Sequence, residues 1–501
     1  MVAATSIPVR PIERVSTGID GLDDVLLGGV QPRRVYLVEG TPGTGKTTLA
    51  LSFLLAGVAA GESALYVTLS ENKLELEATA AVHGWSLAGM DVFELVDQAG
   101  LNPEAEQTVL HPSELELGET TRSVLTRIRE TQPDRIVFDS LSELRLLAQS
   151  AMRYRRQVLA LKQFFTQTGC TVMLLDDRTV DSSDMQLHSI VHGVITLEQL
   201  ALDYGAERRR LRIVKLRGSK YRGGYHDFSI DADGLQVYPR LVASEHHAVF
   251  SDAPVSAGNS RLDQMLGGGL VPGTSALLIG PSGAGKTTIA TCAVVAALRR
   301  GERAAIFQFD EGLATLLSRS RSLGMDLTPF IASGMLTIRQ INPAEMSPGE
   351  FAYYVRNVVQ DGASVVVIDS LNAYLHSMPG ERYLLLQMHE LLSYLNQRGV
   401  VTLMIMAQHG IVGVPKATVD ISYLSDTLIL IRYLDAEGEI RKTLAVLKTR
   451  ASAHEQAACE FRLSADGIEV GPPLRGLDGA LSHAPRRPSN LAVPLLGSGG
   501  V

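Results

Sequence analysis

The sequence predicts two tandem α/β domains, each built on a mostly parallel sheet with helices on both faces. Three observations lead to this fold class: an internal repeat, an alternation of apolar strands with helices in each copy, and a length of 501 residues. That length is about twice the usual size of a single domain. Alternating strands and helices are typical of parallel sheets, and near-continuous Val, Ile and Leu runs indicate strands buried on both sides.

The repeat aligns residues 16–50 with residues 256–290 without a gap. The first segment reads STGIDGLDDVLLGGVQPRRVYLVEGTPGTGKTTLA, and the second reads SAGNSRLDQMLGGGLVPGTSALLIGPSGAGKTTIA. Later segments repeat in the same order, RIVFDS with VVVIDS and VKLRGS with LKTRAS. We therefore predict an N-terminal domain over 1–244, a homologous C-terminal domain over 245–470 and a disordered tail, rich in Pro, Gly and Ser, over 471–501.

The elements follow the same order in the two copies. In the first copy we expect, in chain order, a strand at Val35–Val38, a helix at Thr48–Ala59 and strands at Ala64–Leu69, Ile136–Asp139 and Thr171–Leu175. The second copy predicts a strand at Ala276–Ile279, a helix at Thr288–Leu298 and strands at Ala304–Phe309, Val365–Asp369 and Val401–Met406. In each copy a glycine-rich loop joins the first strand to the helix.

Both glycine-rich loops match G-x-x-x-x-G-K-[ST], which predicts phosphate binding. Glycine lets backbone N–H groups turn toward phosphate oxygens, and the following helix presents its positive end. Lys46 and Lys286 are expected to reach the β- and γ-phosphates of ATP, and the Thr47 and Thr287 hydroxyls to bind Mg²⁺. The expected nucleotide-binding residues are Gly40, Thr41, Pro42, Gly43, Thr44, Gly45, Lys46, Thr47 and Thr48, and Gly280, Pro281, Ser282, Gly283, Ala284, Gly285, Lys286, Thr287 and Thr288.

Asp139 and Asp369 each end an apolar strand downstream of a glycine-rich loop. This is the position of a second metal-side carboxylate, so both are predicted Mg²⁺ ligands. A strand-end aspartate that only caps a turn is the alternative interpretation.

Acidic residues that orient the attacking water are expected just after the second strand of each copy. The candidates are Glu71, which follows Ser70, and the pair Asp310 and Glu311. An acidic pair on the surface is the alternative. With Lys46 and Lys286, these acids form the predicted catalytic set.

Charge and composition argue against several classes of protein. The net charge of −8 is unusual for a nucleic-acid coat protein, and the longest basic run is Arg208–Arg210. The sequence shows neither an apolar run long enough to span a membrane nor the layout of a signal peptide. Cys170, Cys292 and Cys459 form no CxxC pair, so a zinc site or disulfide framework is not expected and the cytoplasm is the predicted location.

The paired loops, the two strands ending in Asp-Ser, the VKLRG and LKTRA segments and the long repeat together resemble the KaiC family over residues 12–470. This family comprises tandem RecA-like P-loop NTPases of the circadian-clock type. The resemblance implies a homo-hexamer with ATP at subunit interfaces, a C-terminal domain capable of autophosphorylation, and a KaiB-like or other signalling protein as partner.

The resemblance also assigns roles to individual residues. The family's catalytic Glu-Glu pair falls on Ser70-Glu71 and on Asp310-Glu311, so the first domain lacks one carboxylate. In this family, trans-acting cations reach the γ-phosphate of a neighbouring subunit. The resemblance places them at Lys215, Arg217, Lys448 and Arg450. An edge strand with solvated charges is the alternative for these basic segments.

The family's adjacent phosphorylation sites fall on Ser422 and Tyr423, where Tyr stands in place of Thr. The resemblance implies that Ser422 accepts a phosphoryl group with Asp310 as the activating base. An ordinary structural serine is the alternative.

The leading hypothesis is an oligomeric Mg-ATP-dependent ATPase with slow hydrolysis and serine autokinase activity, acting in regulation, timing or signalling. A second hypothesis is a DNA-stimulated motor ATPase of the RecA/DnaB type that uses loops at Glu207–Arg212 and Lys215–Arg222. A third is a nucleotide-sensing scaffold with little catalysis, in which ATP clamps the N-terminal domain.

Overall fold

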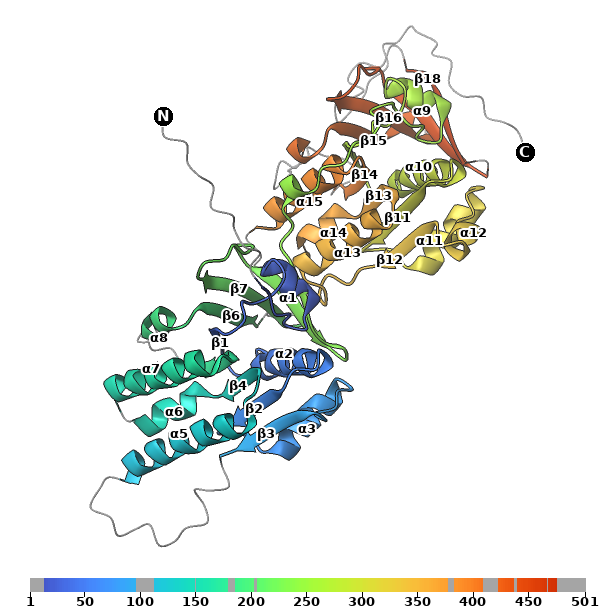
Figure 1. The fold of residues 1–501 in the computed structure, drawn as a ribbon. Helices are drawn as coiled ribbons and strands as arrows, with labels where there is room; N and C mark the ends of the chain where they lie inside the picture. The colour runs from blue at the N-terminus through green and yellow to red at the C-terminus, as the bar shows by residue number, and fades with distance from the viewer. Residues whose placement is uncertain are drawn as a thin grey trace, which may run out of the picture. The chain divides into compact units, whose positions relative to one another are not determined.

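Two compact units, Met1–Arg240 and Leu241–Val501, divide the chain (Figure 1). The computed structural model describes residues 13–95, 112–148, 150–178, 185–201, 205–376, 383–408, 422–436, 439–465 and 467–474. The division falls after Arg240, whereas the sequence placed residues 241–244 in the first domain. These residues go with the second unit because Ala243 is buried in its core beside α15 (Leu384–Gln397).

Each unit contains a nine-stranded sheet, and the strand order is the same in both. In spatial order the first sheet consists of β3 (Met90–Glu94), β2 (Ala64–Thr68), β4 (Arg135–Asp139), β5 (Thr171–Asp177), β1 (Val35–Gly40), β6 (Gly193–Leu200), β7 (Arg208–Leu216), β8 (His226–Asp231) and β9 (Gly234–Tyr238). The second consists of β12 (Leu336–Gln340), β11 (Arg303–Gln308), β13 (Ala363–Asp369), β14 (Val401–Ala407), β10 (Ser275–Gly280), β15 (Thr427–Ala436), β16 (Glu439–Thr449), β17 (Cys459–Ser464) and β18 (Gly467–Pro473).

In both sheets the first six strands run parallel and the last three run antiparallel. The mostly parallel sheet confirms the predicted fold class. Parallel strands require crossover connections, and the helices between them supply these connections.

Helices cover both faces of each sheet. Those of the first unit are α1 (Asp20–Val25), α2 (Lys46–Ala59), α3 (Lys73–Val82), α5 (Pro112–Thr131), α6 (Leu141–Ala148), α7 (Ala151–Thr168) and α8 (Met185–Ile190). Those of the second are α9 (Ser260–Met265), α10 (Lys286–Arg299), α11 (Leu313–Ser322), α12 (Thr328–Ala332), α13 (Pro348–Gln360), α14 (Leu371–His376) and α15, with the short 3₁₀ turns η3 (Ala243–Glu245) and η4 (Ser422–Leu424).

The alternation of side chains along β1 explains this layering. Tyr36 and Val38 pack into the core that contains Phe53 of α2, whereas Leu37 packs into the core that contains Phe165 of α7. Successive strand residues point to opposite faces. A strand covered on both faces is therefore apolar throughout, which is why the sequence shows continuous hydrophobic runs.

The tail prediction needs a correction at its first residues. Strand β18 continues through Pro473, past the predicted end at residue 470, because Val470 pairs with Phe461 and Pro473 with Cys459 of β17. Proline is tolerated there because β18 lies at the edge of its sheet. Residues 475–501 lie outside the described residues. In the part of the chain that the structure describes, no helix is both long and apolar enough to cross a bilayer.

Candidate functional site

Each glycine-rich loop lies at the carboxyl end of a central parallel strand. β1 ends at Gly40 and α2 begins at Lys46, while β10 ends at Gly280 and α10 begins at Lys286. Asp139 and Asp369 end strands two places away in the same sheets. Open α/β sheets bind ligands at this edge. The fold therefore brings together the loop and the aspartate that the sequence predicted for each domain.

The glycine before each helix adopts a left-handed backbone, with φ of 92° at Gly45 and 105° at Gly285. A Cβ on Gly45 would lie 2.4 Å from Ile230 Cδ1, so a larger residue requires displacement of the core. Neither glycine has a side chain to cap its helix. The N–H groups of the first helical turn are therefore presented toward the loop, where they suit an anion.

Lys46 is anchored by its own loop and by an acid from a neighbouring strand. Its Nζ donates to the carbonyl oxygens of Gly40 at 3.0 Å and Thr41 at 3.1 Å. It also forms an ion pair with Asp177 Oδ1 at 2.7 Å. Asp177 ends β5 and was not among the residues singled out from the sequence.

Lys286 has the same loop contacts, and it forms no ion pair with an acid among the residues that the structure describes. Its Nζ donates to the carbonyl oxygens of Gly280 at 2.8 Å and Pro281 at 2.7 Å. Burial lowers the pKa of Lys286, while the charge of Asp369 acts in the opposite direction. Both lysines are buried, so each is a cation placed where water screens it little.

The C-terminal site joins a hydroxyl and a carboxylate directly. Thr287 Oγ1 donates to Asp369 Oδ2 at 2.7 Å, and Gln308 Nε2 donates to the same oxygen at 3.4 Å. Burial raises the pKa of Asp369, and the Thr287 hydrogen bond opposes this. Hydroxyl and carboxylate oxygens are ligands that Mg²⁺ prefers, so Thr287 and Asp369 fit that ion. A bound Mg²⁺ would neutralise phosphate charge there.

In the N-terminal site a phenol stands beside the equivalent carboxylate. Tyr66 OH donates to Asp139 Oδ2 at 2.6 Å. Burial raises the pKa of Asp139, whereas the hydrogen bond from Tyr66 lowers it. Thr47 and Asp139 again offer oxygen ligands suited to Mg²⁺.

Glu71 is the predicted acid with an unsatisfied oxygen. Its Oε2 is buried and has no hydrogen-bond partner among the described residues. Burial raises its pKa, and the nearby charges of Asp139 and Glu75 raise it further. Ser70, which precedes it, brings no carboxylate. A half-buried carboxylate with a raised pKa, close enough to feel the charge of a metal-side aspartate, is typical of a general base.

The two acids of the C-terminal domain have different partners. Asp310 Oδ2 accepts a hydrogen bond from Ser370 Oγ at 2.6 Å. Glu311 Oε1 accepts from Arg319 NH1 of α11, also at 2.6 Å, in an ion pair. Glu311 is therefore neutralised by a cation from its own chain, whereas Asp310 forms no ion pair within the described residues.

Comparison with known proteins supports the arrangement of two domains. A family model for the KaiC ATPase matches residues 15–242 and 255–475. This chain belongs to the KaiC family. It is 27% identical over 494 residues to the circadian clock oscillator protein KaiC of Parathermosynechococcus lividus, which covers 96% of this chain and 89% of that protein.

Other relatives match over similar lengths. The circadian clock oscillator protein KaiC of Synechococcus elongatus is 27% identical over 491 residues, 95% of this chain and 93% of that protein. The circadian clock protein KaiC3 of a Synechocystis strain is 26% identical over 482 residues, 95% of each chain. KaiC-family membership establishes tandem RecA-like domains of an ATPase family.

The predicted trans cations of this KaiC-family chain have partners within the chain itself. Lys215 Nζ donates to the carbonyl oxygens of His188 and Val191, and Lys448 Nζ donates to that of Ser425. Arg217 donates to the Ser189 carbonyl at 2.6 Å, and Arg450 lies 3.6 Å from Asp426. Arg217 and Arg450 are exposed. At the basic segments themselves the pairing is one-sided, because β8 pairs with β7 only at Arg209–Leu211 and β17 pairs with β16 only at Lys442–Leu444, so the edge-strand alternative stays open.

The predicted phosphorylation sites lie at η4. Ser422 begins this turn, and its side chain lies outside the described residues. The side chain of Tyr423 is half exposed, with 50% of its surface accessible.

Three residues near the loops were missed by the sequence analysis: Tyr66, Asp177 and Arg319. Comparing the two copies at the ends of β5 and β14 would have drawn attention to Asp177, because Ala407 is its counterpart in the second sheet. Tyr66 lies inside an apolar strand, where a tyrosine suggests core packing. Arg319 lies inside a helix, where an arginine suggests a solvated surface charge.

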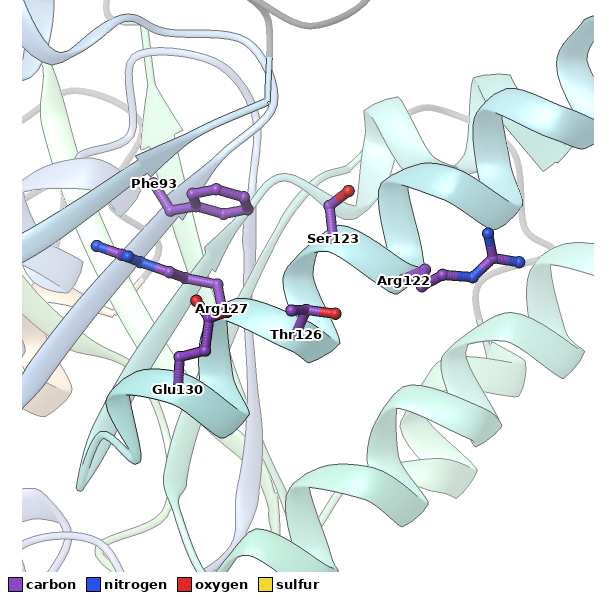
Figure 2. Close-up of a pocket in the computed structure, with 6 residues that line it drawn as sticks. All are labelled: Phe93, Arg122, Ser123, Thr126, Arg127 and Glu130. Atoms are coloured by element: carbon purple, nitrogen blue, oxygen red, sulfur yellow. The ribbon is translucent and has the colours of Figure 1, made fainter.

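A separate pocket of about 320 Å³ lies between β3 and α5 (Figure 2). Phe93, Arg122, Ser123, Thr126, Arg127 and Glu130 line it. The guanidinium of Arg127 bonds both oxygens of Asp91, at 2.8 and 2.9 Å. Its charge is therefore compensated, and no residue of either phosphate loop lines this pocket.

Proposed function

We propose that this KaiC-family chain binds Mg-ATP in both domains and hydrolyses it slowly. The observation that carries the proposal is the duplicated arrangement of a buried loop lysine beside a buried strand-end aspartate. Lys46 acts electrostatically on Asp139, and Asp369 acts on Lys286. A lysine for the β- and γ-phosphates with a hydroxyl and carboxylate for Mg²⁺ is the equipment that phosphoryl transfer requires.

One acid in each domain is assigned to orient the attacking water. In the N-terminal domain it is Glu71, whose Oε2 is buried without a partner. In the C-terminal domain it is Asp310, because Arg319 neutralises Glu311. With one available acid in place of two, each site is expected to turn over slowly.

Steady-state hydrolysis by loop variants tests the proposal. Lys46→Ala and Lys286→Ala should each remove the ATP turnover of one domain. Lys286→Ala should remove most of the total turnover of the chain, and the double variant should show no turnover. Glu71→Gln and Asp310→Asn should lower kcat strongly and should change KM less. Lys73→Ala, an exposed lysine on α3, is the control. Full turnover in the double variant would refute the proposal.

The assembly proposed for this chain is a homo-hexamer with ATP at the subunit interfaces. The exposed residues Arg217 and Arg450, which directly follow β7 and β16, support it, because an exposed cation is available to a phosphate of a neighbouring molecule. Light scattering in ATP and in ADP measures the mass. We expect Lys46→Ala to weaken assembly more than Lys286→Ala; a monomer in saturating ATP would refute it.

Serine autophosphorylation is proposed at Ser422 in the C-terminal domain. Incubation with γ-labelled ATP followed by peptide mass spectrometry should place the label on the segment around η4. Ser422→Ala should abolish the label, while Tyr423→Phe, which removes the other hydroxyl of that pair, should keep it. Label on Tyr423 alone would reassign the site.

The proposed role is regulatory, in timing or signalling, through a KaiB-like or other protein partner. The DNA-motor hypothesis loses one of the two basic loops on which DNA binding was expected to rest. The segment expected to form a loop at Glu207–Arg212 belongs largely to strand β7. There Arg209 pairs with Glu207 at 3.2 Å and Arg210 with Glu198 at 2.9 Å, so these two charges are compensated within the chain.

A further inference from the structure

The ion pair between Lys46 and Asp177 distinguishes the two phosphate loops. The Lys46 ammonium has three N–H donors, and three acceptors of its own chain surround it: the carbonyls of Gly40 and Thr41, and Asp177 Oδ1 at 2.7 Å. Lys286 has only the two carbonyl contacts, and it forms no ion pair within the described residues.

Asp177 is held in place by the sheet, although 37% of its side chain is exposed. Its Cα is in register with Gly40 across the parallel pair of β5 and β1, and the N–H of the next residue, Arg178, bonds the Gly40 carbonyl at 3.1 Å. Ser142 Oγ of α6 donates to the second carboxylate oxygen at 3.1 Å. Strand pairing and this hydroxyl therefore keep the negative charge against the loop.

The counterpart in the second sheet carries no charge. Ala407 is in register with Gly280 across β14 and β10, and Gln408 N bonds the Gly280 carbonyl at 3.0 Å, as Arg178 does in the first domain. The backbone arrangement is thus the same in both domains, and the carboxylate is the difference. Asp139 already lies close enough for the charge of Asp177 to raise its pKa.

We propose that Asp177 makes the N-terminal loop discriminate against the γ-phosphate, so that it favours a nucleoside diphosphate over a triphosphate relative to the C-terminal loop. The inference rests on the proposed nucleotide binding. A loop lysine contacts the β- and γ-phosphates, so a γ-phosphate there meets a fixed carboxylate of like charge. A diphosphate places one fewer phosphate group against that carboxylate, and the repulsion is smaller.

Calorimetric titration of the full chain with a non-hydrolysable Mg-triphosphate analogue and with Mg-ADP tests this. The parent carries Lys286→Ala, so that binding reports the N-terminal loop. Adding Asp177→Asn, which removes the charge and keeps the shape, should tighten triphosphate binding about tenfold and change ADP binding less than about threefold. Equal changes for both nucleotides, or weaker triphosphate binding, would overturn the proposal.

A reciprocal variant keeps the test independent of any folding defect in Asp177→Asn. In a Lys46→Ala parent, Ala407→Asp places a carboxylate at the matching register of the C-terminal loop. It should weaken triphosphate binding about tenfold and leave ADP binding within about threefold. An unchanged ratio of the two affinities would overturn the proposal. If the Lys286→Ala parent binds neither nucleotide, the proposed function of the N-terminal loop fails instead.

Discussion

Tyr66 OH donates a hydrogen bond to the Asp139 carboxylate at 2.6 Å. In the C-terminal domain Thr287 donates to Asp369 directly. The position equivalent to Tyr66 in that domain holds the apolar Ile306. The two metal-side carboxylates are therefore oriented by different donors. Tyr66 is wholly buried, so its hydroxyl has little alternative to this bond.

Tyr66→Phe should destabilise the N-terminal domain, because it leaves a buried carboxylate without its phenol donor. We expect the free energy of unfolding to fall by about 1–3 kcal/mol. A double-mutant cycle with Asp139→Ala, followed by urea denaturation, should give a coupling energy of about the same size. Additive effects of the two substitutions would show that the bond contributes nothing.

Arg319→Ala should raise the turnover of the C-terminal domain. Arg319 lies 2.6 Å from Glu311, and its removal frees a second carboxylate to orient water. Measured with Lys46→Ala to silence the other domain, kcat is expected to increase several-fold. Arg321→Ala on the same helix, whose nearest acid Asp326 lies 3.9 Å away, is the control. A decrease in kcat would mean that the ion pair orients Glu311 productively.

Because His226 is buried, we expect the free energy of unfolding to fall at mildly acidic pH. His226 is fully buried, Arg240 N donates to its Nδ1 at 2.8 Å, and its Nε2 donates to the Arg222 carbonyl at 3.0 Å. Burial lowers its pKa to about 4, from 6.5 in the unfolded chain. Between these values only the unfolded state binds the proton. The stabilisation is therefore complete above the unfolded pKa and declines as the pH falls toward about 4.

Denaturation in urea at several pH values checks this expectation. The contribution of His226 to the free energy of unfolding should decrease by about 2 kcal/mol from about pH 7.5 to about pH 5. His226→Gln should flatten that part of the profile. A variant that keeps the full slope would assign the pH dependence to other groups.

Arg135→Met should destabilise the N-terminal domain by about 3 kcal/mol, because three partners lose a buried cation. Arg135 NH1 donates to the Ser16 and Phe53 carbonyls, each at 2.8 Å, and its Nε pairs with Glu62. Arg127→Met is the matched control. Its pair with Asp91 is partly exposed, so we expect a loss below about 1 kcal/mol. Similar losses in both variants would contradict the argument from burial.

The phosphate loops were predictable because their chemistry is local. In GTPGTGKT and GPSGAGKT, the glycines, lysine and hydroxyl lie within one turn and the start of one helix, so residue types and spacing specify the geometry. Asp139 and Asp369 were predictable for a related reason. Each ends an apolar run, and the carboxyl ends of parallel strands meet at one edge of a sheet.

The sequence by itself determined the duplication, the parallel sheets and the two loops, since these follow from periodicity and contiguous motifs. Only the tertiary structure decided that Asp177 meets Lys46, that Arg319 neutralises Glu311 and that Tyr66 reaches Asp139. Those contacts join elements distant in the chain. Strand order and register place them within hydrogen-bonding distance, and residue types alone do not encode that distance.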